Sequence, residues 1–597
     1  MRLKVEQKVI GREDVLTLEA TPYETRVQAE NIYQLFQATA EKFPKNTALT
    51  FLQTGELDEE PIQINHQQLL EKINQAANMF HSLGITEEDT ISFLLPSLPE
   101  THYTFWGGES VGIVNPINFL LNEAAITELL NTVECKVLVA LGPYPALDIW
   151  EKVMAIRDKI PTLKAIIQVG GTPVNEEGIY QFNDLLRGFP SDQLTFDRNY
   201  SKDDIAAYFH TGGTTGTPKL VKQTHGNQIF SSWANVQMYH FTPQDVIANG
   251  MPLFHVAGSL IIGLAPLLAG AEVVILTPGG MRTPLIVKNQ WKLAEKYGFT
   301  MLGGLPTSLV ALKDVPLDGA DLSQANYCLT GGAMLPQVTA EQFTERIGIP
   351  IGQVFGMTEC SGILCIDPRE GKTNSNSAGI RLPYTKIEIR TQHADGKVGE
   401  KLPLGEIGAI VYQGPNQTPG YLNPIHNQGA FTEDGFLICG DLGRIDEQGY
   451  LYVTGRGKDL IIRSGHNIDP LAVEGVAERH PDVLLCAAVA RPDSYAGEVV
   501  ALYVSVKAGS KVMVAELREY MEQNITERAA LPKVIYIIDE IPTTAVGKIF
   551  KPQLRQDAAK HVYEEELQVL REQGIKVDVQ VIDRPGSGMV AQAILDL

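Results

Sequence analysis

The sequence predicts an α/β fold, with a large N-terminal domain over residues 1–456 and a small α+β C-terminal domain over residues 457–597. Three observations lead to this prediction. The composition, 44% hydrophobic and 20% charged over 597 residues, is that of a globular protein able to bury a large core. Strand patterns alternate with helix patterns through most of the chain, and the character of the sequence changes near residue 456.

The large domain shows the alternation typical of layered α/β proteins. Apolar residues recur at helical spacing over 69–83, and Gly84 follows as a helix stop. Short apolar runs preceded by helix-like stretches predict buried strands at 90–96, 136–141 and 271–276. Such repeated units gather their loops, and therefore their ligands, at the carboxyl ends of the strands.

The small domain begins around the basic, glycine-containing stretch GRGKDLIIRSGHNIDP. A linker there leaves about 140 residues, a plausible size for a separate domain. Near its end the segment 564–573 reads as an exposed helix that stops at Gly574, and residues 575–581 alternate as a strand. The stretch after about residue 560 has no role that the sequence assigns.

Three features predict a cytoplasmic protein. The six cysteines are scattered without metal-type spacing and read as reduced thiols. The first residues carry no apolar run of the kind found in signal peptides. The uncharged run Val256–Ala271 contains Pro266 and is too short for a membrane span, so it reads as a buried helix.

The charge excludes some partners and leaves others open. With 49 Lys+Arg against 71 Asp+Glu, the formal net charge is −22. This argues against a nucleic-acid partner and against anionic membrane surfaces. Peripheral membrane contact stays compatible with a substrate that partitions into bilayers. A locally basic pocket for a small polyanion remains compatible with the sequence.

The most informative motif is YFHTGGTTGTPKLV, at residues 208–221. Its glycines permit a tight loop with inward-pointing N–H groups, and its hydroxyls and lysine suit a phosphate chain. The candidate phosphate-binding residues are Thr211, Gly212, Gly213, Thr214, Thr215, Gly216, Thr217 and Lys219. A Walker-type P-loop is disfavoured, because Pro218 stands before Lys219 and Leu220 after it.

This loop resembles TSGTTGxPKGV of the adenylate-forming superfamily, which includes acyl-CoA synthetases, peptide-synthetase adenylation domains and luciferases. The chain departs from that pattern at Gly213 and Leu220. The resemblance extends over roughly residues 30–555 and implies a mobile C-terminal domain. It also implies ATP, Mg²⁺ and CoA as cofactor and co-substrates.

Two further motifs of the large domain resemble the superfamily's nucleotide site. LTGGAML (329–335) would bring Gly331, Gly332 and Ala333 to the adenine. VFGMTE (354–359) would stack Phe355 on adenine beside Gly356, contact phosphate through Thr358 and hold Mg²⁺ through Glu359, a hard oxygen ligand.

Motifs at and beyond the domain boundary complete the resemblance. By it, Asp441 accepts the ribose hydroxyls, Arg456 reaches the ribose and phosphates, and Lys458 is the hinge. Lys548, in IPTTAVGKIFK, is the catalytic lysine that neutralises charge at the α-phosphate. The CoA site is predicted at Ser464, Gly465 and His466.

The resemblance implies a two-step reaction, in which a carboxylate forms an acyl-adenylate and CoA then takes the acyl group. Amino-acid-activating members carry an Asp where this chain has residues 254–257, with no carboxylate, so an ammonium group would stay unpaired. Acetyl-CoA synthetases carry a Trp at the position of Gly356. A medium- or long-chain fatty acid is therefore predicted, with a pocket lined by His255, Val256, Leu305, Gly356 and Met357.

Two alternatives remain open. A fatty acyl-AMP ligase makes the same adenylate and passes it to a carrier protein. A non-catalytic nucleotide-binding homologue would keep the site without the reaction. The chain would act as a monomer or homodimer.

Overall fold

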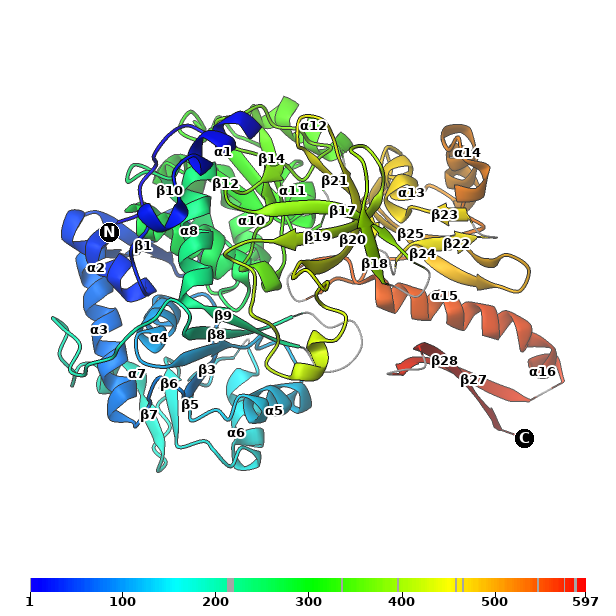
Figure 1. Ribbon diagram of the computed structural model, residues 1–597. Coiled ribbons are helices and arrows are strands. Elements are labelled where there is room, and N and C mark those ends of the chain that lie inside the picture. The colour runs from blue at the N-terminus through cyan, green and yellow to red at the C-terminus, as the bar shows by residue number, and fades with distance from the viewer. Residues whose placement is uncertain are drawn as a thin grey trace.

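The computed structural model describes residues 2–145, 147–211, 219–333, 335, 337–393, 397–456, 459–463, 466–544, 547–573, 575–584 and 588–596. The chain forms a large α/β region with two big sheets, and a smaller region that begins after β21 lies to one side of it (Figure 1). The α/β prediction is confirmed.

The first sheet has seven strands in the order β7-β6-β5-β3-β4-β8-β9, parallel except for the final pair. Every residue of its central strands β3, β4, β5 and β6 is buried, because both faces of the sheet are covered. The strands are β3 (Thr90–Leu94), β4 (Ile113–Pro116), β5 (Val137–Leu141), β6 (Ala165–Val169), β7 (Ile179–Gln181), β8 (Ile205–His210) and β9 (Leu220–Thr224).

The second sheet has nine strands in the order β16-β15-β14-β13-β12-β10-β11-β1-β2, with a parallel centre and antiparallel edges. The strands are β1 (Thr47–Leu52), β2 (Ile62–Asn65), β10 (Val246–Asn249), β11 (Glu272–Leu276), β12 (Met301–Gly304), β13 (Tyr327–Gly331), β14 (Ile351–Phe355), β15 (Cys365–Ile366) and β16 (Ile380–Arg381).

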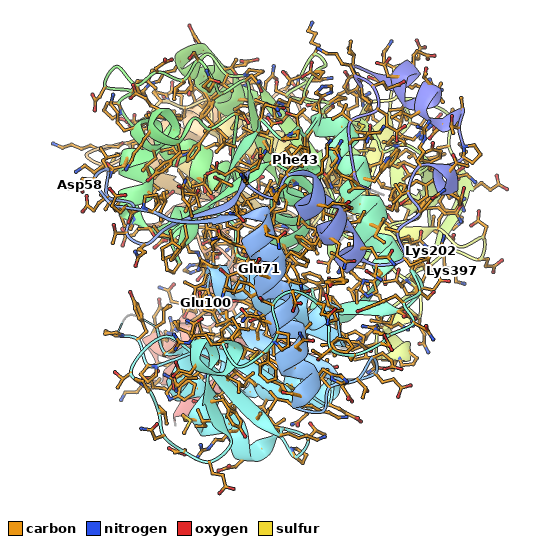
Figure 2. The ribbon with its side chains drawn as sticks, turned by 90° about the vertical axis from the view of Figure 1, so that its left-hand side faces the viewer. Phe43, Asp58, Glu71, Glu100, Lys202 and Lys397 are labelled. Carbon is orange, nitrogen blue, oxygen red and sulfur yellow. The ribbon has the colours of Figure 1, made fainter. Side chains whose placement is uncertain are left out.

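Helices join the two sheets into one core. α3 packs against α4. It also contacts β1 and β2 of the second sheet and α7, a helix that packs on β6 and β7 of the first sheet. Figure 2 shows α3, labelled at Glu71, running from the upper to the lower part of the molecule. A Cβ on Gly107 of α4 would lie 2.6 Å from the Cβ of Ala76, so only glycine permits this close approach. The helices are α1 (Arg12–Glu19), α2 (Ile32–Lys42), α3 (His66–Ser82), α4 (Pro99–Glu109), α5 (Glu123–Thr132), α6 (Ile149–Ile156), α7 (Phe182–Leu186), α8 (His225–Tyr239), α9 (Ala265–Ala269), α10 (Pro284–Tyr297), α11 (Pro306–Leu312) and α12 (Gln337–Ile347).

The predicted elements of the large region are confirmed with small shifts at their ends. The expected helix is α3, which starts where the Asn65 side chain accepts from the N–H of Gln68 at 2.8 Å and ends before Gly84 at φ +80°. The three expected strands are β3, β5 and β11.

The uncharged run Val256–Ala271 is buried, as expected, but it is not one α-helix. Ala257–Leu264 form a π-helix, and α9 follows it. A Cβ on Gly258 would lie 2.4 Å from the carbonyl oxygen of Pro252, so the segment packs too tightly there for any side chain. Apolar periodicity does not distinguish a π-helix from an α-helix, which is why the sequence missed this turn.

A five-stranded antiparallel sheet, β18-β17-β19-β20-β21, completes the large region, and a second mixed sheet of five strands builds the smaller one. The first comprises β17 (Lys386–Gln392), β18 (Val398–Lys401), β19 (Gly408–Gln413), β20 (Leu437–Ile445) and β21 (Leu451–Arg456). The second comprises β22 (Ile461–Arg463), β23 (His466–Ile468), β24 (Val483–Asp493), β25 (Gly497–Val506) and β26 (Val534–Ile537), with α13 (Pro470–Ala477) and α14 (Val514–Asn524). The domain boundary at residue 456 stays a prediction.

The end of the chain differs from the sequence prediction. The helix expected at 564–573 is divided between α15 (Lys551–Glu566) and α16 (Gln568–Glu572), with a break at Leu567. The expected strand is part of β27 (Lys576–Arg584), which pairs antiparallel with β28 (Gly588–Asp596). This hairpin packs on α15, where Val579 is buried (Figure 1).

Candidate active site

The phosphate-loop motif lies between two antiparallel strands, β8 and β9. At its base the N–H of Thr211 donates to the carbonyl of Lys219 at 2.8 Å, which closes the loop. The loop residues Gly212, Gly213, Thr214, Thr215, Gly216 and Thr217 lie outside the described part of the chain. Lys219 is exposed, and its Nζ lies 5.0 Å from the ring centroid of Tyr421, a cation–π contact.

A rigid turn after β14 positions Thr358 and Glu359. The carbonyl of Thr358 accepts from Gln223 Nε2 at 3.0 Å, and the carbonyl of Glu359 accepts from the N–H of Thr418 at 2.8 Å. The Glu359 side chain is 7% exposed, and its Oε1 accepts from the hydroxyl of Tyr421 at 2.7 Å. The turn is thus fixed from β9 and from the loop that contains Thr418 and Tyr421.

The hydroxyl of Tyr421 is the donor of this pair. Burial, and next the charge of Glu359, raise the pKa of Tyr421 well above its usual range. The phenol therefore keeps its proton and donates to the carboxylate. Mg²⁺ prefers hard oxygen ligands, and the nearly buried carboxylate of Glu359 is such a ligand, which would hold the ion together with phosphate oxygens.

Gly331, Gly332 and Phe355 lie at one edge of the second sheet, because β13 and β14 are parallel neighbours with Gly331 opposite Val354. A Cβ on Gly331 would lie 2.3 Å from Cγ1 of Val354, and Gly332 has φ +83°. Ala333 is exposed beside them. Both positions therefore require glycine, Gly331 because of its close neighbour Val354 and Gly332 because of its positive φ.

The structure gives a reason for glycine at position 356 that the sequence did not reveal. A Cβ at this position would lie 1.7 Å from the carbonyl oxygen of Gly362, which is backbone and does not move aside easily. The glycine is required by the close approach of these two segments, whatever the acyl group. It does not by itself measure the space available for an acyl chain.

Asp441 and Arg456 are opposite each other on the neighbouring strands β20 and β21. Asp441 is partly buried and follows Gly440, whose φ is +78°. The side chain of Arg456 and the predicted hinge residue Lys458 lie outside what the structure describes, as do Ser464 and Gly465 of the predicted CoA segment. His466 begins β23, and only its backbone is described.

Lys548 stands on a tight turn of the smaller region and reaches the large one. The N–H of Thr544 donates to the carbonyl of Lys548 at 2.7 Å, and Gly547 has φ +79°. A Cβ on Gly332 would lie 2.9 Å from Cε of Lys548. The structure thus brings together the lysine and the glycine edge, which are far apart in the sequence.

His255 lies near the same lysine. Burial lowers the pKa of His255 to about 3, with smaller effects from the charge of Lys548 and from His210. Its Nδ1 accepts from the N–H of Ala257 at 3.2 Å, so the ring is neutral and carries its proton on Nε2. Val256 next to it is 3% exposed.

Leu305 and Met357, two further predicted pocket residues, are both partly buried. Met357 precedes the Glu359 turn. Leu305 contacts the lysine turn, because a Cβ on Gly547 would lie 2.9 Å from its Cδ1. Sequence reasoning missed this contact and the role of Tyr421, since neither residue belongs to a motif that carries phosphate-binding chemistry.

Comparison with known families decides the identity. A family model described as AMP-binding enzyme matches residues 36–422, and a model described as AMP-binding enzyme C-terminal domain matches residues 472–548. The chain belongs to the AMP-binding enzyme family.

Relatives of this AMP-binding enzyme are CoA ligases by name. It is 34% identical over 587 residues to marinolic acid–CoA ligase of Pseudoalteromonas sp. (strain SANK 73390), covering 97% of this chain and 88% of the relative. It is 27% identical over 568 residues to long-chain-fatty-acid–CoA ligase of Bacillus subtilis (strain 168), covering 90% and 97%. ATP-bound MatB from Rhodopseudomonas palustris has the same fold, with a TM-score of 0.77, 25% identity and coverage of 88% and 99%.

The AMP-binding enzyme is accordingly an acid–thiol ligase of the AMP-forming class, as the motifs predicted. Every helix among the described residues is too short or too polar to cross a membrane. The cytoplasmic location stays a prediction.

Proposed function

We propose that this ligase activates a medium- or long-chain fatty acid. In the first step a carboxylate oxygen attacks the α-phosphorus of ATP, and pyrophosphate leaves. In the second step the thiol of CoA attacks the acyl carbonyl, the thioester forms and AMP leaves.

The observation that carries the proposal is the approach of Lys548 to Gly332 and His255 at the edge of the second sheet. Lys548 is the cation that would stabilise charge developing between the carboxylate and the α-phosphate. Mg²⁺, when bound at Glu359, would neutralise phosphate charge. Asp441 would hold the ribose. Thr211 and Lys219 would stand at the two ends of the phosphate loop.

The fatty-acid substrate rests on the chemistry near His255. That ring is neutral, Val256 and Ile261 are buried, and Ile261 Cγ1 would lie 3.1 Å from a Cβ on Gly362. An apolar acyl group suits such neighbours, whereas an ammonium group would find no carboxylate in residues 254–257. Relatives are named for long-chain fatty acids, marinolic acid and ferulate, so chain length and the choice between aliphatic and aromatic acids are the open variables.

The test is a product analysis with acetate, octanoate, palmitate and ferulate, each with ATP and Mg²⁺, with and without CoA. Mass spectrometry would measure AMP, acyl-AMP and acyl-CoA. We expect octanoyl- or palmitoyl-CoA to form faster than acetyl-CoA or feruloyl-CoA. Preferred use of acetate or ferulate would overturn the substrate, acyl-AMP without any thioester would indicate an acyl-AMP ligase, and no AMP with any acid would indicate a non-catalytic homologue.

A further inference from the structure

The first turn of α11 touches the turn that carries Lys548. The hydroxyl of Thr307 donates to the carbonyl of Gly547 at 3.1 Å. Thr307 belongs to the large region, between β12 and α12, whereas Gly547 belongs to the smaller one. Because Gly547 directly precedes Lys548, this hydrogen bond fixes the backbone from which the lysine side chain starts.

Leu305 adds an apolar contact at the same place. Its Cδ1 would lie 2.9 Å from a Cβ on Gly547, and its Cδ2 would lie 3.3 Å from a Cβ on Gly332. The isobutyl group therefore sits between the glycine edge and the lysine turn. Gly547 also has φ +79°, so a side chain at this position would be both crowded and strained.

The far end of α11 faces the smaller region as well. Lys313 follows this helix, and its Nζ donates to Gln342 Oε1 at 3.2 Å. Burial lowers the pKa of Lys313, and the charges of Asp314, Lys507 and Glu478 act on it in addition. Two of those charges, Lys507 and Glu478, come from the smaller region, so α11 lies along the junction.

We propose that the start of α11 is a latch for the adenylation step, in which Thr307 and Leu305 are positioning residues that hold the Gly547 turn so that Lys548 reaches the nucleotide edge. The proposal rests on the role of Lys548 proposed above. The rotation about Lys458 that the family resemblance implies would have to break these contacts before CoA could react.

The hydrogen bond from Thr307 to Gly547 is neutral and the contact of Leu305 is apolar, which suits such a latch. The net contribution of one hydrogen bond is small compared with the stability of a domain, so the contact can form and break in every cycle. A buried ion pair at the same position would hold more strongly, because breaking it leaves uncompensated charge. The composition of the contact therefore fits a step that must be reversible.

The test separates the two half-reactions in Thr307→Val, Thr307→Ser and Leu305→Ala. Adenylation is measured as acid-dependent pyrophosphate release without CoA, and the second step as thioester formation from supplied acyl-AMP and CoA. We expect Thr307→Val to slow adenylation roughly three- to tenfold, the effect of one lost hydrogen bond, in kcat and not in the KM for ATP. Thioester formation should not fall, and Thr307→Ser, which keeps the donor, should restore adenylation.

A matched control is Thr127→Val in α5, whose hydroxyl donates to the carbonyl of Glu123 at 2.7 Å away from the junction. It should leave both steps unchanged. The latch would be overturned if adenylation stayed normal in Thr307→Val or in Leu305→Ala, or if either variant lost both steps equally. If Lys548→Ala also left adenylation intact, the role proposed for the lysine would fail with it, whereas impaired Lys548→Ala beside normal Thr307→Val would overturn the latch alone.

Discussion

The two charged groups of the site are held in different ways. Glu359 is built into the large region, where Gln223, Thr418 and Tyr421 all donate to its turn. Lys548 stands on a turn of the smaller region, where its backbone N–H donates to the Thr544 hydroxyl and its carbonyl accepts from the Thr544 N–H. In the proposed reaction, the metal ligand Glu359 is thus fixed within the large region, whereas the cation Lys548 comes from the smaller region. This difference suits an enzyme that uses the lysine in one step and removes it for the next.

The energetic reason for the difference is the cost of reorganisation. A carboxylate that holds a metal ion works best when its orientation is set before the ion binds, which the Tyr421 hydroxyl does for Glu359. A lysine that must withdraw cannot be held by several buried hydrogen bonds without slowing its release. The contacts seen on each side follow this requirement.

The largest expected effect comes from removing the mobile cation. Lys548→Ala should slow acyl-adenylate formation by about 10²–10³-fold, the usual cost of losing one preorganised group that stabilises developing charge. Thioester formation from supplied acyl-AMP should be nearly unchanged, because that step does not need the lysine. Rapid-quench measurement of each half-reaction checks this, and equal loss in both would contradict the division between a fixed and a mobile side.

The next effect concerns the pH dependence of the stability of the large region. Burial lowers the pKa of His102 to about 3, and this side chain is 0% exposed. The unfolded chain binds a proton below pH about 6.5 whereas the folded chain does not, so stability falls as the pH drops from about 6.5 towards 3. This residue alone should cost about 2 kcal/mol at pH 5.

The measurement is urea unfolding of the parent protein and of His102→Gln at pH 8 and pH 5. Among the described residues, every histidine whose pKa burial lowers lies before residue 456, so acid should weaken the large region. The variant should lose less stability between the two pH values than the parent. Equal losses in both proteins would show that His102 does not contribute.

The smallest effect tests the hydrogen bond by which Tyr421 orients the Glu359 carboxylate. Tyr421→Phe removes the hydroxyl that donates to Oε1 but keeps the ring that lies beneath Lys219. We expect the apparent affinity for Mg²⁺ during adenylation to fall about tenfold, the lower range for groups that orient a metal ligand. Adenylation rates across a Mg²⁺ titration measure this, with the second step as the internal control. An unchanged Mg²⁺ dependence would mean that backbone contacts alone orient the carboxylate.

The sequence by itself determined the fold class and the order of the motifs from which the family can be recognised. These signals are local: helical spacing over 69–83, a run of glycines and threonines ending at Lys219, and a lysine after Gly547. Each can be read from neighbouring residues, because backbone conformation and side-chain type within a short segment decide it. Two features could not be read from neighbouring residues in this way: the π-helix at Ala257–Leu264 and the break at Leu567 between α15 and α16.

Only the tertiary structure decided which residues support the site. Tyr421 lies 62 positions from Glu359 in the sequence, and Thr307 lies 240 from Gly547, yet each pair shares a hydrogen bond. The sequence predicts open space for an acyl chain at Gly356, whereas in the structure the carbonyl oxygen of Gly362 lies against this residue. A contact between distant segments depends on how layers pack in three dimensions, and no short pattern in the chain records that distance.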